Sequence, residues 1–130
     1  MAQKLKSSYK KEKILDGEVS KKILPILRKI VTTKEGTASL ANVAGYEIGG
    51  KTGTAQVFGL DPEEKYIADN IDEKLRDHAL FTGYAPIENP RVAIAIIVEN
   101  AGSGSSKAAP LARALLDEYF IKNPVDSEKL

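Results

Sequence analysis

The sequence contains no cysteine and only one histidine, His78. The absence of cysteine excludes disulfides, thiolate zinc sites, iron–sulfur clusters and a cysteine nucleophile. A single histidine also excludes a metal site built from several imidazoles. No apolar run approaches the ~18 residues that a membrane span requires, and the N-terminus has no apolar signal-peptide core. We therefore expect the chain as given to be soluble and to hold no metal.

The composition is that of one globular domain, because 42% of the 130 residues are apolar and 28% are charged. The net charge is only +1, but residues 1–34 carry ten lysines and arginines against three carboxylates. A basic N-terminal arm of this kind can bind nucleic acid or an anionic membrane surface. Because only Tyr9 interleaves with the lysines, we favour a solvated segment and predict no nucleic-acid partner.

Apolar periodicity predicts a helix near each end of the chain. Residues 20–31 have apolar side chains at helical spacing, with Pro25 in the first turn or at a kink, and residues 33–36 end the pattern. Ser106 is a candidate cap for a second helix, which carries Pro110 in its first turn.

Three strands are predicted between these helices. Residues 46–58 and 78–84 alternate, and residues 91–99 form an apolar run that indicates a strand buried on both faces. Residues 59–76 read as a polar loop with one short helix. Since the second and third strands are joined too tightly for a crossover, the fold class is α+β, an antiparallel three-stranded meander flanked by an N-terminal and a C-terminal helix.

The stretch from Gly45 to Thr52 matches the phosphate-loop pattern G-x-x-x-x-G-K-[ST]. Such a loop follows a strand and opens a helix, so that backbone N–H groups and the helix dipole face the anion. Here Glu47 places a negative charge inside the loop, and the residues after Thr52 are a poor helix start. A nucleotide-binding loop is therefore only an alternative.

Lys51, Thr52 and Gly53 also match the K-T-G element of serine acyltransferases of the penicillin-binding type. In that chemistry a strand edge borders the active serine and a lysine ammonium supplies positive charge. Hydroxyls hold the substrate carboxylate and a backbone N–H helps bind the oxyanion. Glycine after Lys-Thr lets the acyl group approach the strand, because it has no Cβ. These residue types fit without strain.

Further segments occur in a consistent order and spacing around this triplet, over about residues 20–122. They are Gly36-Thr37-Ala38, Gly50-Lys-Thr-Gly-Thr-Ala-Gln-Val-Phe58, Leu75-Arg-Asp-His-Ala-Leu-Phe-Thr82, Ala85-Pro86, Asn89-Pro90 and Val98-Glu-Asn100. Together they resemble the C-terminal part of the transpeptidase domain of the elongation-type class B enzymes, the penicillin-binding protein 2 family. Residues 20–130 are then that part of the domain, and residues 1–19 are a basic, poorly ordered lead-in.

The resemblance implies a peptidoglycan D,D-transpeptidase that crosslinks stem peptides by serine acyl transfer and is trapped by β-lactams. The implied catalytic residues are Lys51, Thr52 and Gly53. Lys51 would complete the electrostatics around the nucleophile, Thr52 and Thr54 would engage the carboxylate, and the Thr54 N–H would contribute to the oxyanion hole. No cofactor is implied. The implied partners of the whole enzyme are the stem peptide, β-lactams and a membrane glycosyltransferase. Its implied location is the periplasmic face of the bacterial inner membrane.

The family's nucleophile lies in an S-x-x-K motif, followed by an S-x-N motif before K-T-G. Ser7-Ser-Tyr-Lys10 matches S-x-x-K as text, but it stands far too close to K-T-G for the family's spacing. No S-x-N triplet occurs, since Ser39-Leu-Ala-Asn42 is one residue too long. We therefore expect this chain to carry K-T-G without the nucleophile and to be inactive by itself. A non-catalytic interaction module that retains the fold is a further alternative.

The other polar candidates have structural interpretations. His78 is expected to be hydrogen-bonded or half-exposed on its strand. Residues 102–106 read as a strand-to-helix turn, which could border a site. The acidic residues of the loop lack the spacing of a calcium site and read as a solvated face: Asp61, Glu63, Glu64, Asp69, Asp72 and Glu73.

Two helices are few to cover a sheet whose third strand is apolar on both faces. An uncovered sheet face and unpaired strand edges both favour association with a second copy. We therefore predict that the 130-residue chain self-associates.

Overall fold

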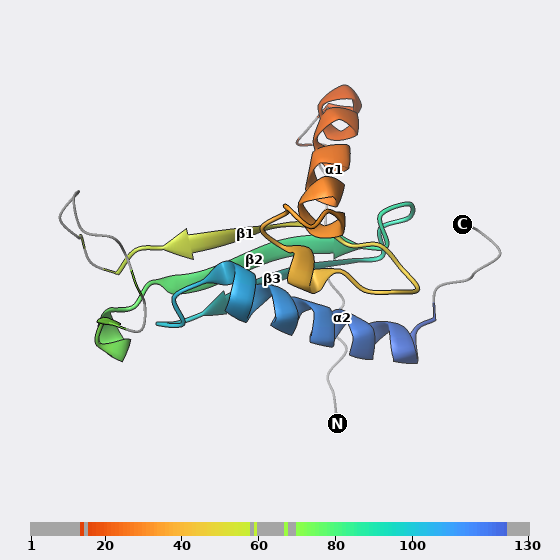
Figure 1. Cartoon of the computed structure of the whole chain (residues 1–130). Helices are drawn as coiled ribbons and strands as arrows, with labels where there is room; N and C mark the ends of the chain where they lie inside the picture. The colour runs from red at the N-terminus through yellow and green to blue at the C-terminus, as the bar shows by residue number, and fades with distance from the viewer. Residues whose placement is uncertain (1–13, 15, 58, 60–66, 68–69, 125–130) are drawn as a thin grey trace.

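The computed structural model describes residues 14, 16–57, 59, 67 and 70–124, which form a sheet with a helix at each end of the chain (Figure 1). The strand order is β1-β2-β3 with antiparallel neighbours, so the predicted α+β meander is confirmed. The elements are α1 (Gly17–Thr32), η1 (Ser39–Ala41), β1 (Gly49–Ala55), η3 (Glu73–Leu75), β2 (His78–Ala85), β3 (Val92–Val98), η4 (Gly104–Ala108) and α2 (Ala109–Lys122). None of the described helices combines the length and the hydropathy that crossing a membrane would need.

The register of the sheet fixes which side chains share a face. Phe81 on β2 pairs with Thr52 on β1 and with Ile96 on β3, whereas Leu80 pairs with Gly53. Successive residues of a strand point to opposite faces. The face with Phe81 and Ile96 packs on α2 and is called the α2 face here; the opposite face, with Leu80, is called the outer face.

Phe81 is the centre of the core between the sheet and α2. Its side chain is fully buried, and its ring lies against Gly50 and Gly83. A Cβ on those glycines would come within 2.5 Å and 2.8 Å of the ring, so both positions require the absence of a side chain. Buried Ala112 and Leu116 of α2 close the core from below. Full burial of a phenylalanine or leucine side chain contributes roughly 1.5–3 kcal/mol.

The segment before β1 joins both helices. The ring of Tyr46 lies 4.6 Å from that of Phe120, and its hydroxyl donates to Asp117 Oδ1 at 2.7 Å. Burial raises the pKa of Tyr46 well above its ordinary value, and the hydrogen bond to Asp117 raises it further. One residue on, Glu47 pairs with Arg28 of α1 at 2.7 Å.

α1 begins at Gly17, so residues 17–19, which we assigned to the lead-in, are helical. The reason is an N-cap that the periodicity did not reveal, because the Asp16 carboxylate accepts the Glu18 N–H at 3.3 Å. The helix runs through Pro25 and ends at Thr32, close to the predicted end. Residues 1–13 of the lead-in lie outside the described residues.

α1 covers the sheet only at its C-terminal end, where Val31 is fully buried and the helix contacts β1. Its N-terminal half rises away from the sheet (Figure 1), and Val19, Ile23 and Ile26 are 40–59% exposed there. The amphipathic pattern therefore identified the helix correctly, but most of its apolar face is not packed on this sheet.

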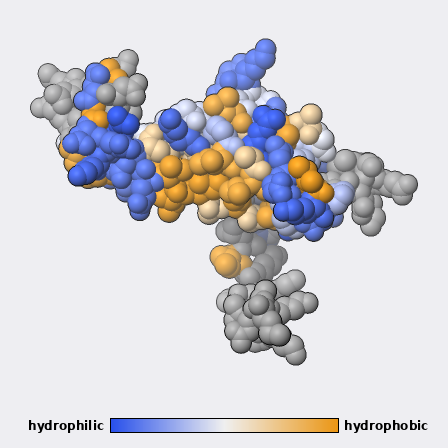
Figure 2. All heavy atoms as spheres, turned by 90° about the horizontal axis from the view of Figure 1, so that it is seen from below, coloured by the Kyte–Doolittle hydropathy of each residue, from blue (hydrophilic) through white to orange (hydrophobic). Residues whose placement is uncertain are grey.

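β3 is not buried on both faces, and that prediction is wrong. Ile96 is half-buried on the α2 face, whereas Ile97 is 68% exposed on the outer face. The physical reason is that α2 and η4 contact β3, while α1 packs on β1 instead. Seen from below, the molecule also shows a broad apolar area across its middle (Figure 2), and α2 carries exposed Leu111 and Leu115.

Helical backbone begins at Gly104, earlier than predicted, but α2 itself begins at Ala109, and Ser106 does not cap it. Ser106 lies inside the π-helical turn η4, which leads directly into α2 with Pro110 in the first turn, as predicted. Gly104, the first residue of η4, packs directly on two strands. A Cβ there would lie 2.5 Å from the carbonyl oxygens of both Gly53 and Leu80, so only glycine lets the turn pack this closely on the strands.

Candidate active site

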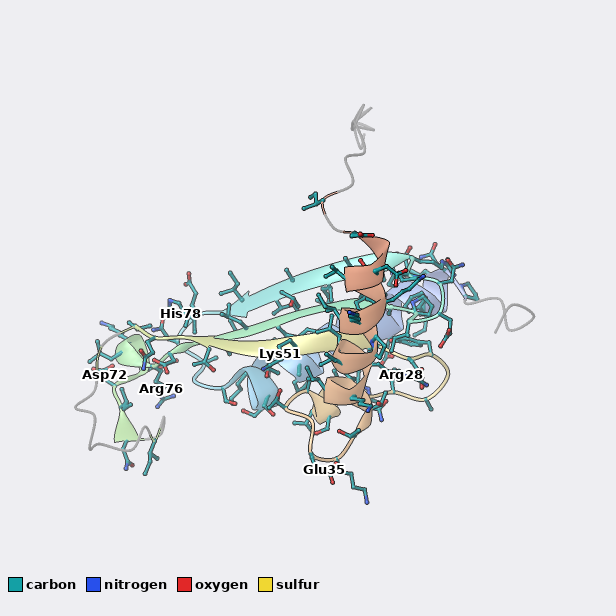
Figure 3. The ribbon with its side chains drawn as sticks, turned by 90° about the horizontal axis from the view of Figure 1, so that it is seen from above. Arg28, Glu35, Lys51, Asp72, Arg76 and His78 are labelled. Carbon is teal, nitrogen blue, oxygen red and sulfur yellow. The ribbon has the colours of Figure 1, made fainter. Side chains whose placement is uncertain are left out.

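The K-T-G triplet lies in the middle of β1, which forms one edge of the described sheet (Figure 3). Strand alternation places Lys51 and Gly53 on the outer face, and Thr52 and Thr54 on the α2 face. Lys51 and Thr54 are exposed, and the two residues between them are half-buried. All four predicted site residues are therefore consecutive on a strand edge, where an extended peptide can pair with the backbone.

The Lys51 side chain folds back over this edge, so that its ammonium contacts the strand. Its Nζ donates to the Thr52 carbonyl oxygen at 2.8 Å and lies 3.4 Å from the Thr52 hydroxyl oxygen. The positive charge of Lys51, a residue of the outer face, thus lies beside the Thr52 hydroxyl, which belongs to the α2 face. This arrangement can hold an anion beside the strand.

Thr37 is a member of this cluster that sequence reasoning did not assign. The Thr52 hydroxyl donates to Thr37 Oγ1 at 2.9 Å, and Lys51 Nζ lies 3.4 Å from the same oxygen. Gly36-Thr37-Ala38 did contribute to the resemblance, but a separation of fourteen residues from Lys51 carries no information about proximity. Only the docking of α1 and its following turn on β1 brings the two together.

Gly53 has a packing reason in addition to its predicted role in substrate approach. A Cβ at this position would lie 3.2 Å from Leu80 Cβ on the outer face, which is closer than most real contacts. On the opposite side, η4 presses Gly104 against the Gly53 carbonyl. Residues 102–106, predicted as a strand-to-helix turn, therefore support the K-T-G strand from below.

The phosphate-loop alternative is wrong. Lys51 and Thr52 stand inside an extended strand that is paired with β2. The strand continues through Ala55, and no helix begins directly after Thr52. Their backbone N–H groups therefore cannot converge on a phosphate at a helix N-terminus.

His78 does not belong to the Lys51 cluster. It pairs with Ala55, four residues along β1, which corresponds to about 13 Å at the ordinary rise of a strand. Its ring is half-buried, and its Nδ1 accepts the Asn100 N–H at 3.0 Å. The predicted structural role of His78 is therefore confirmed.

The acidic loop residues are described only in part. Asp72 caps η3 by accepting the Lys74 N–H at 3.2 Å, and Glu73 is exposed. Within the described ranges, no group of three or more histidine or acidic residues could hold a metal ion. Asp61, Glu63, Glu64 and Asp69 lie outside the described residues, as does the matched stretch from Ser7 to Lys10. Ser39 belongs to the short turn η1.

An α+β sheet that presents K-T-G on an edge strand, with a helix packed beneath it, is the arrangement expected for the transpeptidase fold of penicillin-binding proteins. The family model for the penicillin-binding protein transpeptidase domain matches residues 2–117. The chain therefore belongs to this transpeptidase family, and the matched range includes most of the predicted lead-in.

Individual relatives support the same family assignment. The chain is 46% identical over 101 residues to the peptidoglycan D,D-transpeptidase MrdA of Haemophilus influenzae, a match that covers 77% of this chain but 16% of the relative. It also resembles the crystal structure of Pseudomonas aeruginosa PBP2 in complex with WCK 5153, with a TM-score of 0.64 and 34% identity over 88% of this chain and 22% of that one. A complex of PBP2 and MreC from Helicobacter pylori has a TM-score of 0.68 and 26% identity, covering 85% and 19%.

These similarities confirm the predicted resemblance to penicillin-binding protein 2. The chain spans only about a fifth or less of the length of these relatives.

Proposed function

We propose that this chain forms the K-T-G region of a peptidoglycan D,D-transpeptidase of the penicillin-binding protein 2 type. The observation that carries the proposal is the Lys51 ammonium, held by hydroxyl and carbonyl oxygens at the open edge of β1. In the proposed reaction a serine oxygen attacks the carbonyl carbon of the penultimate D-alanine, and the terminal D-alanine leaves. An amine of a neighbouring stem peptide then displaces the serine from the acyl group.

Four consecutive residues of the strand, from Lys51 to Thr54, have a role in this reaction. Lys51 stabilises the charge that develops near the nucleophile, which acts from an S-x-x-K motif elsewhere in the enzyme. Thr52 and Thr54 share a face and bind the terminal carboxylate, and the Thr54 N–H helps bind the oxyanion. Gly53 leaves the substrate room to approach, and the free strand edge pairs with the extended peptide. A β-lactam would occupy the same positions.

Substitution of Lys51 tests the catalytic role. In the complete transpeptidase that carries this segment, Lys51→Ala should slow acylation by fluorescent penicillin about 100-fold or more, the scale for removing a preorganised electrostatic group. Lys22→Ala is the matched control, because Lys22 is an exposed lysine on α1. Equal acylation rates for Lys51→Ala and wild type would remove the catalytic assignment and favour a non-catalytic interaction module.

The 130-residue chain alone should form no covalent adduct with penicillin. The test is labelling with fluorescent penicillin followed by denaturing electrophoresis. A labelled band that disappears in Ser7→Ala or Ser8→Ala would show instead that the matched S-x-x-K stretch is a nucleophile.

Partners and location follow from the same proposal. The H. pylori relative was solved in complex with MreC. We propose that the whole enzyme works at the periplasmic face of the bacterial inner membrane, with a membrane glycosyltransferase of the elongation machinery. Co-purification of the whole enzyme with that glycosyltransferase from detergent-solubilised membranes would support this assembly, and separate elution of the two would oppose it.

A further inference from the structure

The turn that follows α1 holds Thr37 in a fixed position. Gly36 packs so closely on the end of α1 that a Cβ would lie 2.1 Å from the Ile30 carbonyl oxygen. The Gly36 N–H donates to the Thr33 carbonyl at 3.2 Å, and the Ala38 N–H donates to that of Ile30 at 3.2 Å. The Ala38 side chain is fully buried. Both neighbours of Thr37 are therefore anchored, and its exposed side chain is the one group of the triplet directed away from the core.

The Thr37 hydroxyl oxygen is the point at which two donors of β1 meet. It accepts the Thr52 hydroxyl at 2.9 Å and the Lys51 ammonium at 3.4 Å. A hydroxyl oxygen has two lone pairs, so this one atom can serve both donors. Without it, the Thr52 hydroxyl would lose its described acceptor, and the ammonium would depend on Thr52 alone.

The need for such support follows from the exposure of Lys51. A lysine side chain has a flexible stem of four carbons and, when exposed, populates many rotamers. Electrostatic catalysis requires the charge to be oriented before the reaction, because reorientation during the reaction costs free energy. An acceptor fixed by α1 and its turn limits that freedom from outside the strand.

We propose that Thr37 is a positioning residue of the acyl-transfer site, which orients the Lys51 ammonium and the Thr52 hydroxyl. The inference rests on the proposed function of the K-T-G strand. It makes the orientation of K-T-G depend on how α1 is docked, because Thr37 belongs to the turn that α1 anchors.

The experiment uses the complete transpeptidase that carries this segment, with fluorescent penicillin as the probe. Thr37→Val keeps the shape and removes the hydroxyl, and Thr37→Ser keeps the hydroxyl. Thr32→Val is the matched control, because the Thr32 hydroxyl donates only within α1, to the Arg28 carbonyl at 3.0 Å. The measured quantities are the limiting acylation rate, the apparent dissociation constant and the thermal midpoint.

Thr37→Val should lower the limiting acylation rate about tenfold, the scale of a small misplacement of a catalytic group. Thr37→Ser should stay within about threefold of wild type, and Thr32→Val should match wild type. The thermal midpoint should not change, because Thr37 is exposed. A wild-type rate for Thr37→Val, or a Thr37→Ser variant as slow as Thr37→Val, would overturn the inference.

Lys51→Ala distinguishes a failure of the proposed function from a failure of the positioning role of Thr37. If Lys51→Ala acylates normally, the proposed function itself fails. If Lys51→Ala is slow and Thr37→Val is normal, only the positioning role of Thr37 fails.

Discussion

The contact of Gly104 with two strands gives a sharp prediction about folding. A Cβ at this position would lie 2.5 Å from the carbonyl oxygens of Gly53 and Leu80, whereas an ordinary contact begins at 3.4 Å. Both obstacles are backbone atoms of paired strands, so neither can rotate away. Gly104→Ala must therefore push η4 off the sheet by about 0.9 Å, together with the buried Ala108 that follows.

Overpacking of a close contact costs typically 1–3 kcal/mol, and we expect about 3 kcal/mol here because two rigid atoms oppose the new methyl group. With an ordinary urea dependence of about 1.5 kcal/mol per molar, the unfolding midpoint should fall by about 2 M. The assay is urea unfolding of the 130-residue chain, followed by far-ultraviolet circular dichroism. Amide spectra should show the largest shifts at Gly53 and Leu80.

Gly17→Ala is the matched control. Nothing lies within 4 Å of a Cβ built on Gly17, the first residue of α1, and alanine is the better helix former. This variant should be as stable as wild type or slightly more stable. If Gly104→Ala and Gly17→Ala unfold at the same urea concentration, η4 does not pack on β1 as described.

The remaining predictions concern the core, a turn and the assembly state. Tyr46→Phe removes the hydrogen bond to the Asp117 carboxylate and should cost about 1.5–3 kcal/mol in urea unfolding, whereas a cost near zero would contradict the contact. Because the pKa of Tyr46 is raised in the folded state, wild-type stability should be constant at neutral pH and fall as the pH rises above about 10, and Tyr46→Phe should weaken that fall in a pH series. Asn100 has a φ of 53°, and its side chain donates to the carbonyls of Lys74 and Arg76. Both Asn100→Ala and Asn100→Gly lose these hydrogen bonds, but only glycine adopts the positive φ freely, so Asn100→Ala should be the less stable variant. The reverse order of thermal midpoints would refute this. The chain should self-associate at micromolar concentration because β3 leaves Ile97 exposed, and a concentration-independent mass of 14.1 kDa by light scattering would show that it does not.

Local patterns were sufficient where neighbours in sequence are also neighbours in space. Alternation predicted β2, and an apolar run predicted β3, each to within a residue at either end, and apolar spacing predicted both helices. The K-T-G triplet is contiguous, so its place on a strand followed from sequence alone. The family likeness added the chemistry of that strand, because several motifs in a fixed order are far more specific than three residues.

Tertiary structure decided what no local pattern contains. Thr37 meets Lys51 across fourteen residues, because the end of α1 docks on β1. Ser106 does not cap the C-terminal helix, because helical backbone already begins at Gly104, in the turn η4 that packs against two strands. The periodicity of apolar residues predicts on which face of an element an apolar side chain lies. Whether that face is covered depends on which elements pack against it, and this is why the apolar run of β3 did not show that Ile97 is exposed.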